Sequence, residues 1–157
     1  MTTITNVPRS EIKIGNSATY TKTCTEDDVK LFAVVSGDVN PIHLDAEFAA
    51  TTQFGQQIAH GMYTGALVSA ALAIELPGPG TIYLGQDIKF RAPVFIDDTI
   101  TVELTVSEFR EDKGIVTLDC VCTNQHGKAV AKGTATVIAP EDKMTVEAPQ
   151  LPTVTLS

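Results

Sequence analysis

The sequence is poor in basic residues. Only 11 of its 157 residues are lysine or arginine, against 19 aspartates and glutamates, and the net charge at pH 7 is −8. Nucleic acids and anionic membrane surfaces repel a protein of that charge, which excludes nonspecific binding to either. A local basic patch can still bind a phosphate group, so an anionic small molecule stays open as a ligand.

Cysteine is scarce, and the count of three is odd. Cys120 and Cys122 lie two residues apart in a segment that alternates like a strand, where both side chains point to one face and are poorly placed to bridge. A zinc site needs more ligands than this pair offers. We therefore expect reduced core cysteines in a cytoplasmic protein.

The sequence also lacks a long hydrophobic run. Its most apolar stretch, residues 62–76, has 15 residues and includes Glu75, whereas a membrane-spanning helix needs about 20. Residues 1–6 contain no basic segment followed by an apolar one, so we expect no targeting signal. Length and composition fit a single domain, residues 1–157, with a core at about 12–139 and an extended tail at 140–157.

The first half of the chain is predicted to be helical. Thr25 and Asp28 resemble a capping box, which begins a helix that ends near Gly37 because turn residues follow. A short helix is expected over residues 45–51. Residues 62–76 are apolar on nearly every side and rich in glycine and alanine, which is typical of a buried helix closely approached by a sheet.

In the second half, the hydrophobic period changes to two. Four strands are predicted around residues 82–90, 100–107, 116–123 and 129–138, and residues 18–23 supply a fifth. Turn residues at 112–114 and 124–128 predict antiparallel hairpins. The pattern favours an α+β fold in which an antiparallel sheet wraps around a central buried helix, and its open edges favour pairing of two subunits.

One segment carries candidate chemistry. Asp38 and His43 are five residues apart in a loop that holds Gly37 and Pro41, and together they form a candidate acid–base pair. Gly61, at the start of the buried helix, offers a free backbone N–H to a developing negative charge on a substrate oxygen. On pattern alone, an Asx-type turn with a structural histidine explains Asp38 and His43 better than catalysis does.

A family resemblance favours catalysis over the structural explanation of Asp38 and His43. Residues 36–43 (SGDVNPIH) resemble the signature of MaoC-like (R)-specific enoyl-CoA hydratases, and the likeness continues at 48–52 (FAATT), 58–62 (IAHGM), 82–86 (IYLGQ) and 90–94 (FRAPV). It covers roughly residues 12–139, and single-domain members that feed polyhydroxyalkanoate synthesis match best in length. The family often has Gly-Asp where this chain has Asp97-Asp98, a difference confined to a turn.

The resemblance implies a homodimeric hot-dog fold and the (R)-specific hydration of trans-2-enoyl-CoA, with coenzyme A as part of the substrate and no other cofactor or metal. It assigns Asp38 and His43 to catalysis, Asn40 to shaping the loop between them, and Gly61 to binding the thioester oxygen. Ser69 is assigned to polar support on the buried helix.

Several expectations have open alternatives. Gly65, Ser69 and Leu72 form one stripe of the buried helix, which either lines an acyl tunnel closed by Leu72 or packs on the sheet. His60 either caps or packs against the helix start, or it binds a metal with His43, Asp38 and Asp45. Lys89 and Arg91 are candidates for binding CoA phosphates.

Two other functions remain for the chain as a whole. The first is a (3R)-hydroxyacyl-ACP dehydratase, although the acidic chain shows no basic rim for an acidic carrier protein. The second is a thioesterase or thioester-binding hot-dog protein without hydratase activity, which the intact Asp38, Asn40 and His43 disfavour.

Overall fold

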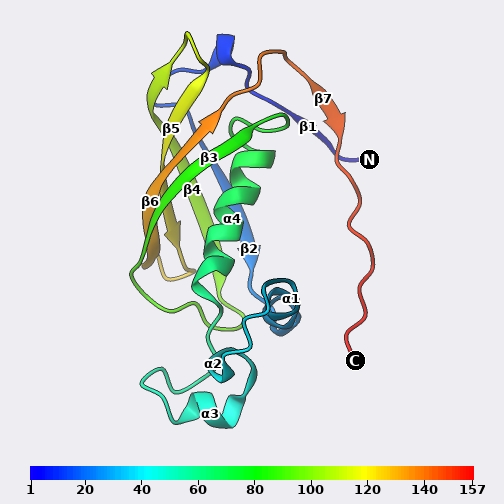
Figure 1. The fold of residues 1–157 in the computed structure, drawn as a ribbon, viewed down its shortest axis with the longest axis vertical. Helices are drawn as coiled ribbons and strands as arrows, with labels where there is room; N and C mark the ends of the chain where they lie inside the picture. Colours follow the sequence, from blue (N-terminus) through cyan, green and yellow to red (C-terminus); the bar gives the residue numbers. More distant parts are fainter.

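A five-stranded antiparallel sheet curves around one long helix in the computed structural model, which describes residues 1–157 (Figure 1). The elements in chain order are β1 (Thr3–Thr5), a 3₁₀ turn (Arg9–Glu11), β2 (Ser17–Thr23), α1 (Glu26–Ser36), α2 (Pro41–Leu44), α3 (Ala46–Ala50), α4 (Gly61–Ile74), β3 (Ile82–Phe90), β4 (Thr99–Arg110), β5 (Ile115–Thr123), β6 (Ala129–Ile138) and β7 (Thr145–Glu147). The predicted α+β hot-dog architecture is confirmed. None of the helices has the length and apolar character needed to cross a membrane.

The strand order of the sheet is β2-β4-β5-β6-β3. Both predicted hairpins are present, and they join β4 to β5 and β5 to β6. The two strands that enter from earlier in the chain, β2 and β3, pair antiparallel with β4 and β6 and form the two edges. Helix α4 lies across the concave face of the sheet (Figure 1). The chain then enters β3, the edge strand opposite β2.

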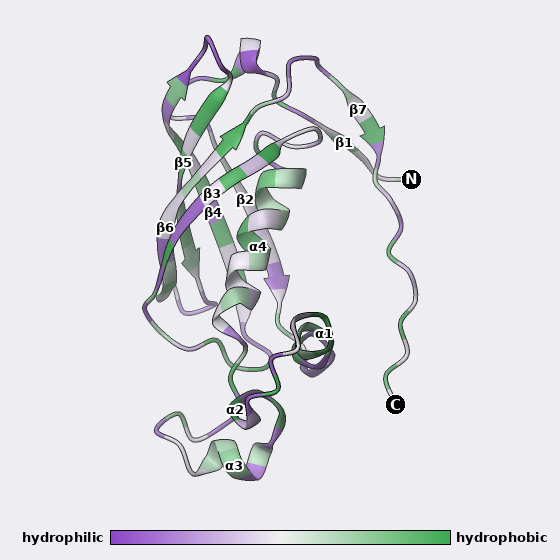
Figure 2. Cartoon of the chain, in the orientation of Figure 1, coloured by the Kyte–Doolittle hydropathy of each residue, from purple (hydrophilic) through white to green (hydrophobic).

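The core lies between α4 and the sheet. Along β4 the fully buried side chains alternate with less buried ones, as the two-residue period requires. Hydrophobic residues run along α4 and the central strands (Figure 2). The α4 residues that pack in the core are Tyr63, Leu67, Val68, Ala71 and Leu72. All three cysteines are free and buried, so the expected unbridged core cysteines are confirmed.

The β3 edge is different, because it exposes hydrophobic side chains. Ile82, Leu84 and Phe90 are each at least half exposed, and Tyr83 is 38% exposed. No strand pairs with the outer side of β3. An unpaired edge that carries apolar side chains is a surface for association with another chain.

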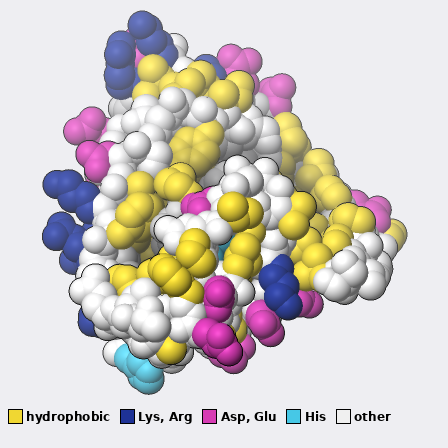
Figure 3. All heavy atoms as spheres, turned by 60° about the horizontal axis from the view of Figure 1, so that its bottom comes forward, with side chains coloured by type: hydrophobic (Ala, Val, Ile, Leu, Met, Phe, Trp, Pro, Cys, Tyr) yellow, Lys and Arg dark blue, Asp and Glu magenta, His cyan; other side chains and the backbone are white.

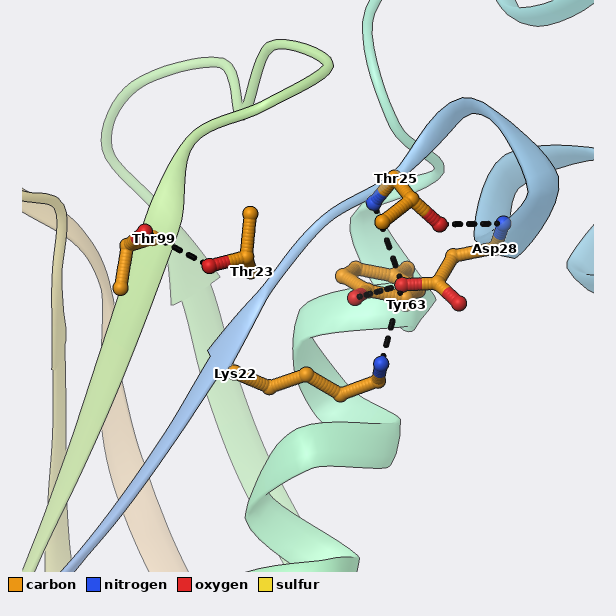
Figure 4. Close-up of polar contacts among 6 residues, drawn as sticks. All are labelled: Lys22, Thr23, Thr25, Asp28, Tyr63 and Thr99. Carbon is orange, nitrogen blue, oxygen red and sulfur yellow. Dashed lines mark hydrogen bonds and ion pairs between the residues drawn. The ribbon is translucent and has the colours of Figure 1, made fainter.

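The start of α1 is fixed by a cluster of polar contacts (Figure 4). Thr25 and Asp28 form the predicted capping box, in which each side chain accepts from the backbone N–H of the other residue at 3.1 Å. The same Asp28 oxygen that Thr25 contacts also accepts from the Tyr63 hydroxyl at 3.1 Å and pairs with the Lys22 ammonium at 3.1 Å. Asp28 thus joins α1 to α4 and to β2.

These contacts affect how the cluster titrates. Burial alone would raise the pKa of Asp28, but the bonds from Thr25, Lys22 and Tyr63 outweigh it and hold the pKa below its usual value. Burial raises the pKa of the neighbouring Cys24 thiol to about 11, and it raises the pKa of Tyr63 as well. All three groups therefore keep one protonation state at neutral pH.

One element was not predicted, a ribbon formed by the two ends of the chain. β1 and β7 pair antiparallel, with Ile4 opposite Val146. The buried Asn6 side chain holds this ribbon to the body, because its amide donates to the carbonyls of Pro79 and Asp142 and accepts from the N–H of Met144. The expected extended tail at 140–157 therefore contains a short paired strand, β7.

Candidate active site

The site begins at the C-terminal end of α1. Gly37 ends the helix in the left-handed conformation with φ 78°, a geometry that favours glycine. The Ser36 hydroxyl then accepts from the N–H of Asp38, and Asp38 Oδ1 accepts from the N–H of Asn40, both at 3.1 Å. Asn40 caps α2 in turn by accepting from the N–H of Ile42 at 3.2 Å. Local side-chain bonds thus give the loop its shape.

His43 lies in α2 and is only 7% exposed. Its Nδ1 is 2.7 Å from the carbonyl oxygen of Ile58. A carbonyl accepts only, so Nδ1 carries the hydrogen in this contact and Nε2 of the neutral ring keeps a free lone pair. The backbone therefore sets the tautomer that can remove a proton.

His60 brings the two candidate residues together. It is 3% exposed and directly precedes α4, and its Nε2 donates to the backbone carbonyl of Asp38 at 3.0 Å. Its ring stacks on the His43 ring with centroids 3.9 Å apart, and Phe32 packs against it at 4.9 Å. No side-chain bond caps the helix, so packing, one of the expected roles, is the one the structure shows.

Asp38, His43 and His60 form one polar cluster. A carboxylate oxygen of Asp38 and one ring nitrogen from each histidine all lie within 4.8 Å of one another. Nδ1 of His60 has no hydrogen-bond partner although it is buried. Asp45, the fourth residue in the metal alternative, instead caps α3 through the N–H of Phe48.

The donor set of the cluster resembles that of a transition-metal site, since both imidazoles also bond backbone carbonyls. The orientation of the rings fits a metal poorly. Tetrahedral coordination needs lone pairs that converge on one point, whereas the ring planes of His43 and His60 are stacked at 26°. That the site works without a metal stays a prediction.

Gly61 lies beside the cluster at the first position of α4. Its N–H has no carbonyl one turn earlier within the helix, and it adds to the positive end of the helix dipole. A Cβ at this position would lie 3.0 Å from the ring of Phe90, so only glycine fits without moving that ring. The requirement for glycine is therefore steric.

A cavity of about 330 Å³ opens in front of Gly61. Its lining includes His60, Thr64, Phe90 and Arg91, the last of which was a candidate for binding CoA phosphates. Lys89, the other candidate, is not part of this lining. In Figure 3, hydrophobic side chains gather around a hollow on the face that carries the loops of the first half of the chain.

The α4 stripe predicted to line an acyl tunnel, Gly65, Ser69 and Leu72, lies partly on a groove and partly in the core. Gly65 and Ser69 border a second groove of about 410 Å³ together with Phe32, Met62, Ala66, Tyr83 and Gln86. Leu72 instead packs in the core and is 1% exposed. The packing alternative for the stripe thus holds for Leu72, while Ser69 faces a groove and has no hydrogen bond to its own helix.

Two residues that line these spaces were not predicted as site residues. Tyr83 borders the groove and Phe90 lines the cavity. In the structure Tyr83 donates its hydroxyl hydrogen to Gln86, and burial raises its pKa to about 12, so it stays a donor at neutral pH. The only indication in the sequence was that both residues lie in segments that resemble the hydratase family, 82–86 and 90–94.

Comparison with known proteins identifies the family of this chain. The model of the MaoC like domain matches residues 9–136. An (R)-specific enoyl-CoA hydratase of Rhodospirillum rubrum is 47% identical over 130 residues, which are 83% of this chain and 90% of that protein. A mitochondrial 3-hydroxyacyl-[acyl-carrier-protein] dehydratase of Arabidopsis thaliana is 32% identical over 141 residues, 88% of this chain and 84% of that protein.

Among solved structures, the R-hydratase of Pseudomonas aeruginosa in its unliganded form superposes with a TM-score of 0.95 at 49% identity. The alignment covers 99% of this chain and 100% of that one. The resemblance drawn from residues 36–43 is confirmed, and the chain belongs to the MaoC-like domain family.

Proposed function

We propose that this protein is an (R)-specific enoyl-CoA hydratase, a hydro-lyase that adds water to trans-2-enoyl-CoA and forms (R)-3-hydroxyacyl-CoA reversibly. The observation that carries the proposal is the proximity of Asp38 and His43, whose polar atoms lie within 4.8 Å of each other and of His60, the residue that precedes the unpaired N–H of Gly61. Coenzyme A enters as part of the substrate, and the proposed reaction uses no other cofactor.

The reaction begins with a water molecule held between the Asp38 carboxylate and Nε2 of His43. One of the two groups takes a proton from the water while its oxygen forms a bond to Cβ of the substrate. The π electrons move toward the thioester, and a proton from the pair is delivered to Cα. Because both groups lie on one side of the substrate, water adds to one face in a syn manner.

Gly61 stabilises the charge that develops during this step. Negative charge builds on the thioester oxygen as the enolate forms, and a backbone N–H at the start of α4 donates to it without rearranging. The dipole of a 14-residue helix adds to this effect. Asn40 keeps the catalytic loop in shape, and Ser69 offers a hydroxyl to the groove in which the acyl chain lies.

The proposed enzyme acts as a homodimer in the cytoplasm. The apolar, unpaired edge of β3 supports a dimer, since pairing removes an exposed edge. The free buried cysteines support a reducing compartment. Sedimentation at micromolar concentration is expected to give about twice 16.7 kDa, and a fully active monomer would contradict the dimer.

A direct assay tests the function. Purified protein mixed with crotonyl-CoA should remove the absorbance of the conjugated enoyl thioester, and the product should be the (R)-3-hydroxy enantiomer. Release of free CoA without hydration would instead indicate a thioesterase. An enoyl-ACP substrate turned over much faster than the matching enoyl-CoA would favour the carrier-protein dehydratase, which the Arabidopsis relative keeps as second candidate.

A further inference from the structure

The last nine residues form an arm that makes little use of its own subunit. Residues 149–157, the C-terminal arm, follow the terminal ribbon, and the last backbone hydrogen bond before them is donated by Ala148 to Thr2. No residue of the arm takes part in a hydrogen bond or ion pair. All are exposed except the half-buried Leu156.

The composition of the arm is unlike that of a solvated tail. It contains no charged residue, and its sequence PQLPTVTLS carries three apolar branched side chains. Leu151 is 93% exposed and Val154 is 55% exposed. Disordered tails stay in water by being charged and poor in apolar residues, and this arm is neither.

The terminal ribbon that precedes the arm is fixed next to the turn that leads into the edge strand β3. Asn6 bonds the carbonyl of Pro79, in the turn that leads into β3, and also bonds Asp142 and Met144 ahead of β7. Beyond β7 the arm continues as an extended segment alongside α4 and α1 (Figure 1). The terminal ribbon that carries the arm is thus anchored at the turn that begins β3, the edge strand at which the proposed dimer pairs.

The extent of the match to the Pseudomonas aeruginosa R-hydratase adds a second observation. The two chains superpose over 99% of this one, so almost none of the arm falls outside the alignment. Holding nine residues in one extended course costs roughly 1–2 kcal/mol per residue of backbone entropy. Contacts are needed to offset that cost, and within its own subunit the arm makes no hydrogen bond and half-buries only Leu156.

We propose that the C-terminal arm docks on a second copy of this chain and clasps the dimer. The proposal rests on the homodimer proposed above. Nine extended residues span up to about 30 Å, enough to cross a subunit boundary that begins at β3. Leu151 and Val154 supply the apolar contacts, and the arm is not part of the catalytic machinery.

Sedimentation equilibrium over a dilution series tests the clasp. The double variant Leu151→Asp/Val154→Asp is expected to raise the dimer dissociation constant at least tenfold, and so is a chain that ends at Ala148. Thr153→Asp places a charge in the same arm without removing an apolar side chain, and it should change the constant by less than threefold. At protein concentrations that restore the dimer, crotonyl-CoA turnover per site should match the unsubstituted protein.

Photocross-linking identifies the surface that the arm contacts. With Leu151→benzoylphenylalanine, irradiation of mixed ¹⁵N-labelled and unlabelled protein should give cross-linked peptides that combine both isotopes, which only contact between copies produces. Cross-links confined to one isotope would show the arm folding back on its own subunit and overturn the proposal. An unchanged dissociation constant in the double variant would overturn it too.

Hydratase activity is read separately, so the possible failures can be told apart. A monomeric unsubstituted protein would remove both the dimer and the clasp while leaving the crotonyl-CoA result intact. A stable dimer that does not hydrate crotonyl-CoA would remove the enzymatic proposal and leave the clasp standing.

Discussion

Helix α1 has a functionally different carboxylate at each end. Asp28, in its first turn, accepts from Thr25 and Tyr63 and pairs with Lys22, and its side chain is 19% exposed. Asp38, just beyond its last residue, is exposed and accepts one bond, from the N–H of Asn40. The two residues have the same chemistry but differ in how many partners they have.

The contrast separates a structural acid from a reactive one. A hydroxyl, an ammonium and a backbone N–H all converge on Oδ2 of the half-buried Asp28, so this oxygen is not available to bind water and exchange a proton with substrate. Asp38 is exposed and accepts a single hydrogen bond, at Oδ1, so its Oδ2 remains accessible. The fold thus positions Asp38 without occupying it.

Removing the reactive group should have the largest effect. Asp38→Asn and His43→Ala are each expected to lower kcat by roughly 10²-fold or more, as is usual when a positioned acid or base is lost. Melting temperature should change little for Asp38→Asn, since this side chain is exposed. Steady-state kinetics with crotonyl-CoA measure the effect, with Asp28→Asn as the matched control. Near-normal turnover in either variant would remove that residue from the mechanism.

Helix α4 also carries a functional candidate and a structural residue close together, since Ser69 faces a groove and Leu72 packs in the core. Leu72→Ala should cost roughly 2–5 kcal/mol of stability, because it leaves a cavity among well-packed neighbours. If Leu72 also closes the acyl tunnel, the ratio of kcat/KM for octenoyl-CoA over crotonyl-CoA should rise. Denaturant unfolding and that ratio, measured on the same variant, decide between core packing alone and a second role in chain-length selection.

Asp28→Asn should lower stability and leave activity unchanged, the opposite of what we expect for Asp38→Asn. We expect a loss of about 1–3 kcal/mol from the weakened cap and the broken ion pair, with kcat per folded site unchanged. The pH dependence follows from the lowered pKa of Asp28 in the folded state. The stability it contributes is present above its unfolded pKa of about 3.9 and is lost as pH falls through the lower folded value.

Melting temperatures measured between pH 6 and pH 2 should therefore fall more steeply for the unsubstituted protein than for Asp28→Asn. Parallel curves would show that Asp28 contributes no acid-dependent stability. Lys22→Met breaks the ion pair alone and should give an intermediate slope.

His60 tests whether positioning can be separated from reaction. His60→Phe keeps an aromatic ring against His43 but removes the N–H that bonds the Asp38 carbonyl. We expect kcat to fall about tenfold, since a small displacement of a catalytic group is costly. KM for crotonyl-CoA should stay within a factor of two. His60→Gln, which retains an N–H donor, should recover part of the loss, and a failure to do so would argue against the hydrogen bond as the cause.

Most of the fold followed from local patterns in the sequence. The capping box at Thr25, the stop at Gly37, the strands β2–β6 and the buried helix were all predicted, because capping, periodicity and turn chemistry depend on neighbouring residues. The short helix α2 was not predicted. The terminal ribbon was missed as well, because pairing Ile4 with Val146 depends on contacts between opposite ends of the chain.

The site was only partly predictable for the same reason. Asp38 and His43 lie in one short motif, whereas His60 joins them through a fold that brings the start of α4 against the loop after α1. No spacing in the sequence shows that contact. Similarly, the stripe from Ser69 to Leu72 was correct in its geometry, but the sequence could not say which part of it the sheet would cover.

The smallest effect is expected at Asp97, in the turn before β4, where the family resemblance led us to expect glycine. Asp97 is the only residue other than glycine with a positive φ, 74°, and its N–H donates to the Cys24 carbonyl at 2.6 Å. The left-handed conformation costs an ordinary side chain roughly 1–2 kcal/mol, although aspartate tolerates it better than most. Glycine removes that strain but loses about 0.5–1 kcal/mol through greater freedom in the unfolded chain.

Asp97→Gly should therefore stabilise the protein by only about 0.5 kcal/mol, a rise in Tm of roughly 1–2 °C. Asp97→Ala removes the same charge but keeps a Cβ, so it should be less stable than the unsubstituted protein. If the alanine variant melted as high as the glycine variant, loss of charge rather than relief of backbone strain would explain the gain.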